Sequence, residues 1–269
     1  MPRVPRILAI ANQKGGVGKT TTAINLAASL AAAELPTLLV DCDPQGNATS
    51  GLGVAPVDGQ PTLYQVLSGE AELAAALRTT ALDGLEVVPA SRDLVGLNLE
   101  LAVAEARELR LARALVRAPE RLRFIVLDCP PALDLLTLNA LTAAQAVIIP
   151  MQCEYFALEG LAQLLDTIAA VQARWNPGLE IAGVLLNQFE ERTHLSRQVT
   201  AELRRHFGAR IFRTTVPRNV RLAEAPSFGQ PALLYDVRSK GSEAFLQLAR
   251  EVIERELAQS GTQSIGAGA

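Results

Sequence analysis

Several features that mark other protein classes are scarce or missing in this chain. Its three cysteines stand far apart without a C-x-x-C pair, which argues against a disulfide framework or a zinc site and favours a reducing cytosol. Cys42 and Cys129 are interpreted as small buried hydrophobes. No run of about 18 apolar residues is present, so the sequence excludes a membrane-spanning helix. Aromatic residues make up only 4% of the chain, and the net charge is −3, so any nucleic-acid binding needs a local basic patch.

What is present describes a layered α/β protein. Hydrophobic residues make up 49% of the 269 positions, enough for a large core of Ala, Leu, Val and Ile. Short, continuous apolar runs alternate with helical patterns, which is typical of a parallel sheet covered on both faces. Strands are expected at residues 6–11, 37–41, 85–89, 124–128, 146–151, 181–187 and 211–216. Helices are expected at residues 19–33, 93–116, 135–143, 158–175, 196–207 and 242–257.

The chain shows no internal division. No linker rich in proline, glycine or serine interrupts it, and no repeat is visible. We therefore predict a single doubly wound α/β domain with a mostly parallel sheet over residues 1–257. Residues 258–269 are small and polar, so we expect a disordered tail there and not an amphipathic membrane anchor.

The most specific motif lies between the first expected strand and the first expected helix, where residues 12–21 read NQKGGVGKTT. In a P-loop, backbone N–H groups wrap the β-phosphate, a lysine reaches the β- and γ-phosphate oxygens, and a hydroxyl binds Mg²⁺. Lys19 and Thr20 stand at the last two of these positions. The motif predicts a fold of the P-loop NTPase type. It also predicts ATP contacts from Lys14, Gly15, Gly16, Val17, Gly18, Lys19, Thr20 and Thr21.

The loop departs from the usual motif because Gln13 replaces its first glycine and a second lysine, Lys14, follows. Only three of the 25 basic residues are lysines, and two of them lie in this loop, which indicates a need for a compact ammonium group. With this deviant loop the chain resembles the ParA/MinD class of deviant Walker-A ATPases, and most of all the ParA/Soj partitioning family. The supporting segments are VDCDPQGNAT (40–49), VLDCPP (126–131), GVLLN (183–187) and VPRNVRLAEAPSFG (216–229).

The resemblance gives roles to residues that follow the expected strands. It implies that Asp43 positions or polarises the attacking water and is a candidate Mg²⁺ ligand, and that Asp128 holds Mg²⁺ through water. Lys14 would cross a dimer interface to the partner's nucleotide and neutralise charge there, as an arginine finger does. The expected catalytic residues are Lys14, Lys19 and Asp43. The residues expected to surround the base are Asn187, Pro217 and Asn219.

Arginine is concentrated in one segment. Between residues 190 and 221, eight arginines accompany three acidic residues, so the segment carries +5 and the rest of the chain −8. Arginine contacts phosphates without reading base sequence, which suits non-specific DNA binding; an ordinary solvated helix face is the alternative for each arginine. The candidates for DNA contact are Arg192, Arg197, Arg204, Arg205, Arg218 and Arg221.

By this resemblance the chain is an ATPase of DNA segregation, cytoplasmic and nucleoid-associated, that uses ATP and Mg²⁺ and hydrolyses slowly. The ATP-bound homodimer would bind double-stranded DNA non-specifically until a ParB/Spo0J-like protein stimulates hydrolysis, and no membrane partner is expected.

One alternative is a MinD-like membrane-cycling division regulator, which would need a basic amphipathic C-terminal helix. Another is a metabolic P-loop enzyme, such as a dethiobiotin-synthase-like ligase, which gives no reason for Lys14. A non-hydrolysing scaffold is disfavoured by the intact Asp43.

Overall fold

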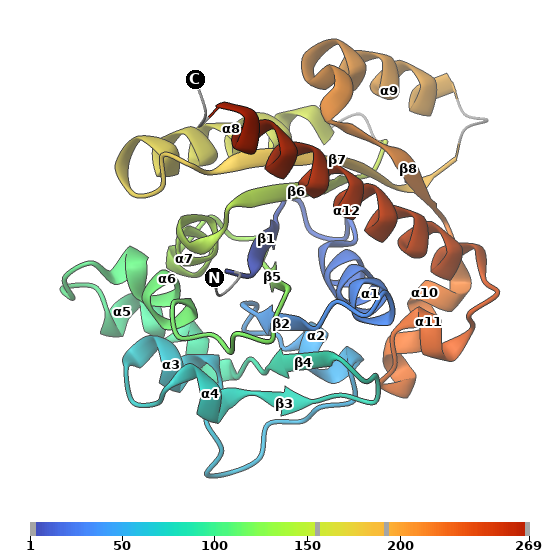
Figure 1. Ribbon diagram of the computed structural model, residues 1–269. Coiled ribbons are helices and arrows are strands. Elements are labelled where there is room, and N and C mark those ends of the chain that lie inside the picture. The colour runs from blue at the N-terminus through green and yellow to red at the C-terminus, as the bar shows by residue number, and fades with distance from the viewer. Residues whose placement is uncertain (1–3, 154–156, 191–193, 267–269) are drawn as a thin grey trace.

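A single mixed sheet organises the molecule (Figure 1). The computed structural model describes residues 4–153, 157–190 and 194–266. Within these residues eight strands form one sheet in the order β3-β4-β2-β5-β1-β6-β7-β8. The strand pairings are parallel except where the short β3 (Arg78–Thr79) runs antiparallel to β4. The expected mostly parallel sheet is confirmed.

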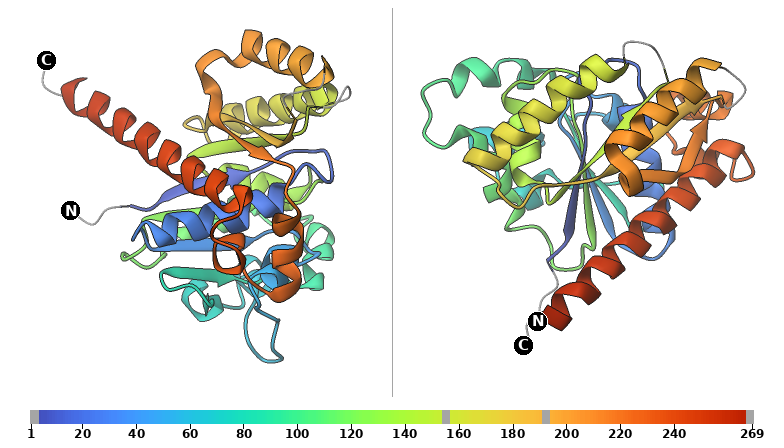
Figure 2. Two further views of the ribbon diagram at one scale, coloured as in Figure 1. Left: turned by 90° about the vertical axis from the view of Figure 1, so that its right-hand side faces the viewer. Right: turned by 90° about the horizontal axis from the view of Figure 1, so that it is seen from above.

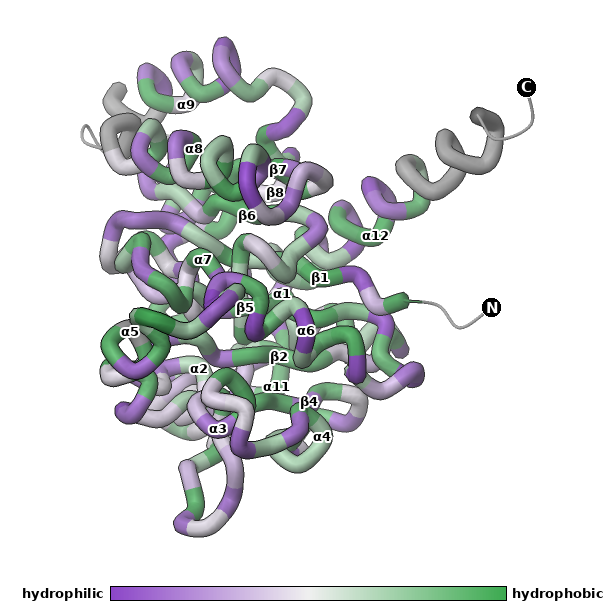
Figure 3. The backbone as a smooth tube through the Cα atoms, turned by 90° about the vertical axis from the view of Figure 1, so that its left-hand side faces the viewer, coloured by the Kyte–Doolittle hydropathy of each residue, from purple (hydrophilic) through white to green (hydrophobic). Residues whose placement is uncertain are grey.

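All seven strands expected from the sequence form, with ends that differ by at most two residues. Their central members are apolar and buried on both faces, which fixes them as strands of a covered parallel sheet. Figure 3 shows the hydrophobic colour concentrated on these central strands. The observed bounds are β1 (Arg6–Ile10), β2 (Thr37–Asp41), β4 (Leu85–Val88), β5 (Phe124–Asp128), β6 (Ala146–Met151), β7 (Glu180–Phe189) and β8 (Ile211–Pro217).

Helices cover both faces of the sheet (Figures 1 and 2). Side chains of α3 to α9 pack on one face, and those of α1, α2 and α10 to α12 on the other. Their bounds are α1 (Lys19–Ala32), α2 (Asn47–Gly51), α3 (Leu63–Ser68), α4 (Leu73–Ala76), α5 (Leu97–Glu100), α6 (Arg110–Leu115), α7 (Leu135–Ala143), α8 (Ala157–Arg174), α9 (His194–Phe207), α10 (Val220–Glu224), α11 (Ala232–Tyr235) and α12 (Lys240–Gly266).

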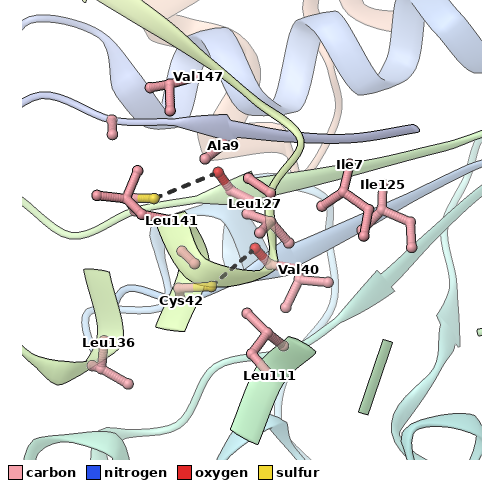
Figure 4. Close-up of a cluster of buried hydrophobic side chains, with 14 of the residues drawn as sticks. Ile7, Ala9, Val40, Cys42, Leu111, Ile125, Leu127, Leu136, Leu141 and Val147 are labelled. Atoms are coloured by element: carbon pink, nitrogen blue, oxygen red, sulfur yellow. Dashed lines mark hydrogen bonds between the residues drawn. The ribbon is translucent and has the colours of Figure 1, made fainter. Parts of the chain in front are cut away.

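Successive strand residues point to opposite faces and so supply two separate cores. Ile7 and Ala9 of β1 face the α3–α9 layer, where Figure 4 shows them near Val147 and Ile125. Leu8 and Ile10 of the same strand face α1 and α12. Cys42 and Cys129 are buried in the first of these cores, as expected. Within the described residues, no helix is long and apolar enough to cross a membrane.

The predicted helix over residues 93–116 is wrong. The segment instead forms α5 and α6 with 3-10 turns before each of them, at Arg92–Val95 and Arg107–Leu109, and Ala106 between the two helices has a φ of 50°. The cause is a tertiary contact, because the side chain of Asn139 on α7 binds the backbone here. Its Oδ1 accepts from the Leu111 N–H at 3.0 Å, and its Nδ2 donates to the Arg107 carbonyl at 2.9 Å. These bonds replace helical hydrogen bonds that a continuous helix would need.

The chain also differs from expectation near its end. Helix α12 continues to Gly266, so helical backbone occupies most of the stretch 258–269, where the sequence predicts a disordered tail. No proline follows Leu257, so nothing in the local backbone stops the helical hydrogen bonds from continuing. The extent of the folded domain, residues 1–257, stays a prediction.

Candidate nucleotide-binding site

The glycine-rich loop joins the end of β1 to the start of α1, at the carboxyl edge of the sheet. Strand β1 lies between β5 and β6. After β1 the chain crosses to β2 on one side of the sheet, and after β5 it crosses past β1 to β6 on the other side. Ligands of open α/β sheets bind at such a switch point. Gly16 and Gly18 have φ values of 77° and 88°, which other residues rarely adopt. A Cβ on Gly18 would also lie 2.7 Å from the Asn187 side chain.

Both lysines of the loop are tied to its backbone. The buried Lys19 Nζ donates to the carbonyl of Lys14 at 3.0 Å. The N–H of Lys14 donates to Asn12 Oδ1 at 3.0 Å, and Asn12 Nδ2 donates to the carbonyl of Pro150 on β6 at 2.7 Å. Burial lowers the pKa of Lys19, opposed by the negative charges of Asp128 and Asp43. A phosphate would supply the counter-charge that this buried ammonium needs.

Asp128 ends β5 and is completely buried. Among the described residues neither of its carboxylate oxygens makes a hydrogen bond, although the Thr20 hydroxyl lies close enough to favour its charged form. Burial first, and then the nearby Asp41 carboxylate, hold the pKa of Asp128 well above its usual range. A buried carboxylate without a hydrogen bond, beside a threonine hydroxyl, is suited to a hydrated Mg²⁺ ion, and the Mg²⁺ role of this pair stays a prediction.

Asp43 lies just beyond the end of β2, on the same edge as the loop. Its side chain is 8% exposed, and its Oδ1 accepts from the N–H of Gln45 at 2.9 Å. The negative charge of Asp43 acts on Lys19, which places the two groups in one electrostatic neighbourhood. The structure therefore brings together three of the side chains expected in catalysis and metal binding: Lys19, Asp43 and Asp128.

A pocket of about 520 Å³ opens beside the loop and contains all three residues expected around the base. Asn187 Nδ2 donates to the carbonyl of Val17 and to the Thr22 hydroxyl, each at 3.0 Å. Its Oδ1 is buried and makes no hydrogen bond within the described residues, so one acceptor of this side chain is unsatisfied beside the pocket. Asn219 Oδ1 caps α10 by accepting from the Arg221 N–H at 2.8 Å, and Pro217 forms part of the wall.

The expected DNA-contacting arginines do not form one cluster. Arg204 and Arg205 lie in the last turn of α9, next to the start of β8, whereas Arg218 and Arg221 follow its end. Seven strand residues, about 3.3 Å each, separate the two groups. Helix α9 runs from the end of β7 back to the start of β8. Arg197, in the first turn of α9, therefore lies toward the carboxyl edge of the sheet, where Arg218 and Arg221 also lie. Arg192 lies outside the described residues.

Two of these arginines are engaged with acids. Arg221 pairs with Glu224 at 2.8 Å and Asp236 at 3.4 Å, and its guanidinium lies 6.0 Å from the Tyr235 ring. Arg205 pairs with Glu202 at 2.9 Å. Pairing lowers the positive potential around these arginines, and the sequence count of +5 does not include Glu224 or Asp236, which lie beyond residue 221.

Comparison with known proteins identifies the family. A family model described as an AAA domain matches residues 5–181. The chromosome partitioning protein ParA of Caulobacter vibrioides is 54% identical over 253 residues, which cover 93% of this chain and 95% of that protein. This chain belongs to the ParA/Soj family of partitioning ATPases.

A second relative agrees with this ParA/Soj assignment. The sporulation initiation inhibitor protein Soj of Bacillus subtilis is 51% identical over 247 residues, covering 92% of this chain and 98% of that one. Among solved structures, a cobyrinic acid a,c-diamide synthase from Mycobacterium smegmatis with bound ATP analog and magnesium matches with a TM-score of 0.80 and 39% identity. That match covers 92% of this chain and 93% of the synthase. The resemblance stated from the sequence and the P-loop NTPase type of the fold are confirmed.

Proposed function

We propose that this chain binds ATP with Mg²⁺ and hydrolyses it slowly in a cytoplasmic, nucleoid-associated DNA-segregation system. The observation that carries the proposal is the buried Asp128, whose carboxylate makes no hydrogen bond among the described residues. It lies beside Thr20, which belongs to the P-loop with its two lysines. The unsatisfied acceptor of Asn187, a residue that lines the adjacent pocket, supports adenine as the base. The names of the ParA and Soj relatives support the role in partitioning.

Thr20 and Asp128 would hold the metal ion, which supplies positive charge against the phosphates when bound. Lys19 would contact the β- and γ-phosphate oxygens, and Asn187 would accept from the base. Asp43 would accept a hydrogen bond from the attacking water and orient it toward the γ-phosphorus. The new bond joins the water oxygen to phosphorus as the bond to the β-phosphate oxygen breaks, giving ADP and phosphate.

The oligomeric cycle is the second part of the proposal. Two copies would enclose two ATP molecules, with Lys14 of each copy reaching the nucleotide of the other. The anchored backbone of Lys14 supports this role, because a residue that reaches across an interface must start from a fixed point. The dimer would bind double-stranded DNA without sequence preference, and a ParB/Spo0J-like partner would stimulate hydrolysis and release it.

The test is ATP turnover by the purified chain with DNA and a ParB-like protein, each added alone and together. We expect slow hydrolysis alone and a marked stimulation when both are present. Turnover that instead requires a small carboxylic acid and is indifferent to both partners would contradict the partitioning role. Co-sedimentation with liposomes in ATP would favour the MinD-like alternative.

A further inference from the structure

A second buried carboxylate lies beside Asp128 and has no role in the site described so far. Asp41 ends β2, pairs with Asp128 in the register of the sheet, and is completely buried. Burying two carboxylates side by side is unfavourable, because like charges repel and both lose their hydration. The presence of a carboxylate here therefore requires a reason.

Three donors converge on this carboxylate, in contrast to Asp128. Asp41 Oδ1 accepts from the N–H of Asp43 at 3.2 Å. Its Oδ2 accepts from the N–H of Thr49 at 2.8 Å and from the Thr49 hydroxyl at 2.6 Å. One carboxylate therefore closes both ends of the loop between β2 and α2, the loop that carries Asp43. A group that only accepts is needed to satisfy three donors, which explains a carboxylate at this position.

The hydroxyl of Thr49 is fixed from a second direction. Its oxygen accepts from the N–H of Ala90 at 3.0 Å while its hydrogen points to Asp41. Thr49 is 1% exposed, so water does not compete for either bond. The hydroxyl thus links the segment after β4 to the carboxylate that closes the loop. Such a fully satisfied network in a buried setting holds its members rigidly.

We propose that Asp41 and Thr49 are positioning residues that set where the Asp43 carboxylate stands relative to the γ-phosphate. The inference rests on the proposed function, in which Asp43 orients the attacking water. The Asp43 side chain is itself bonded to the neighbouring Gln45 N–H, which moves with the loop and so does not fix it in space. Its fixed reference is its own N–H on Asp41, and Asp41 is held by Thr49.

The same geometry separates hydrolysis from nucleotide binding. Among the described residues, neither Asp41 nor Thr49 is hydrogen-bonded to the loop at 14–21. The carboxylates named as acting on the charge of Lys19 are Asp128 and Asp43. Loss of the Thr49 hydroxyl should therefore displace Asp43 and leave the phosphate cradle intact.

The experiment compares Thr49→Val, which keeps the volume and removes the hydroxyl, with Thr49→Ser, which keeps the hydroxyl. Thr214→Val is the matched control, because Thr214 also donates to a buried carboxylate, Glu251, on the side of β8 that faces α12. We measure kcat, affinity for a non-hydrolysable ATP analogue, and thermal unfolding of the full chain.

For Thr49→Val we expect kcat to fall about tenfold or more with an affinity within about twofold of wild type. Thr49→Ser and Thr214→Val should hydrolyse at nearly the wild-type rate.

Several results would overturn the inference. Wild-type kcat in Thr49→Val beside an inactive Asp43→Ala would refute the positioning role and leave the proposed function standing. Equal losses in Thr49→Val and Thr49→Ser, or losses of kcat and affinity that merely track the fall in thermal stability, would show a structural role only. Should Thr49→Val not fold, Asp41→Asn tests the same bond network with the same three readouts. No hydrolysis by the wild-type chain would overturn the proposed function and the inference together.

Discussion

Lys14 is held by its backbone at both ends, which sets it apart from an ordinary surface lysine. Asn12 Oδ1 accepts from its N–H, and the Lys19 ammonium donates to its carbonyl. Asn12 is in turn anchored to β6 through the carbonyl of Pro150. Sequence reasoning gave Asn12 no role, because an asparagine before a glycine-rich turn has no distinguishing signal until its partners are seen.

The two loop lysines should therefore fail in different ways. Lys19→Ala should abolish ATP binding, because the β- and γ-phosphate charge then lacks its main cation. Lys14→Ala should bind nucleotide and lose the ATP-dependent dimer, because its proposed contact lies across the interface. Nucleotide titration and light scattering with ATP measure the two effects. A normal ATP-dependent dimer in Lys14→Ala would refute the cross-subunit role.

Replacing Asp43 tests the water-positioning role directly. Asp43→Ala should dimerise on ATP and hydrolyse at least about a hundredfold more slowly, since the water loses its acceptor while Lys19 and Thr20 still hold the phosphates. The expected product is a dimer that stays on DNA. Single-turnover hydrolysis after mixing with ATP measures the rate. Cleavage at the wild-type rate would show that the Asp43 side chain serves the turn, where it accepts from the N–H of Gln45, and has no catalytic role.

At the scale of elements, strands were predictable and some helices were not. A buried parallel strand needs only an apolar run, so the bounds of β2, β5 and β6 follow directly from the sequence. The failed helix at 93–116 depended on Asn139, a residue more than twenty positions downstream. The site shows the same division. The glycine loop, Asp43 and Asp128 follow local motifs. Asp41 and Thr49 also lie in one such motif, residues 40–49, but their hydrogen bonds to each other and to Ala90 become visible only in the structure, as does the separation of the arginines.

The contact between β8 and α12 supplies a prediction about stability. Glu251 of α12 is 4% exposed and accepts from the N–H groups of Arg213 and Thr214, from the Thr214 hydroxyl and from Arg255. Burial raises the pKa of Glu251, but these hydrogen bonds outweigh it, so the pKa is lowered overall. A lowered carboxyl pKa stabilises the fold above the unfolded-state pKa, and this contribution is lost as pH falls through the folded-state value.

Glu251→Gln should therefore reduce the free energy of unfolding by about 2 kcal/mol at pH 7, because charge-assisted bonds become neutral and one acceptor becomes a donor. The difference from wild type should shrink as pH falls through the lowered pKa of Glu251, where Glu251 also becomes protonated. Urea unfolding at several pH values measures it. Glu254→Gln, which alters an exposed partner of Arg213, serves as the control and should change little. A pH-independent difference would contradict the assignment.

At the scale of the whole molecule, the base pocket and part of the basic surface share one short segment. Pro217 and Asn219 line the pocket, while Arg218 and Arg221 in the same turn are exposed. The side chain of Asn219 also caps the helix that carries Arg221. A DNA surface here would lie beside the nucleotide, and dimerisation would present it twice. Two linked sets of contacts multiply their binding constants, so ATP could switch DNA affinity without forming a new surface.

Arg221 provides the test of this arrangement. Arg221→Glu should weaken binding to any duplex alike, while ATP-dependent dimerisation survives. Each phosphate contact contributes about 0.9 to the slope of log K against log salt, so Arg221→Ala should flatten the slope of the dimer by roughly 2 for two lost contacts. The matched control is Arg213→Ala, since Arg213 is also exposed and paired with two acids, Glu251 and Glu254, but projects from β8 toward α12. The measurement is DNA affinity at several salt concentrations, with ATP and with ADP, on two unrelated duplexes. An unchanged slope in Arg221→Ala, an equal loss in Arg213→Ala, or a loss confined to one duplex would place the DNA surface elsewhere or make its recognition sequence-specific.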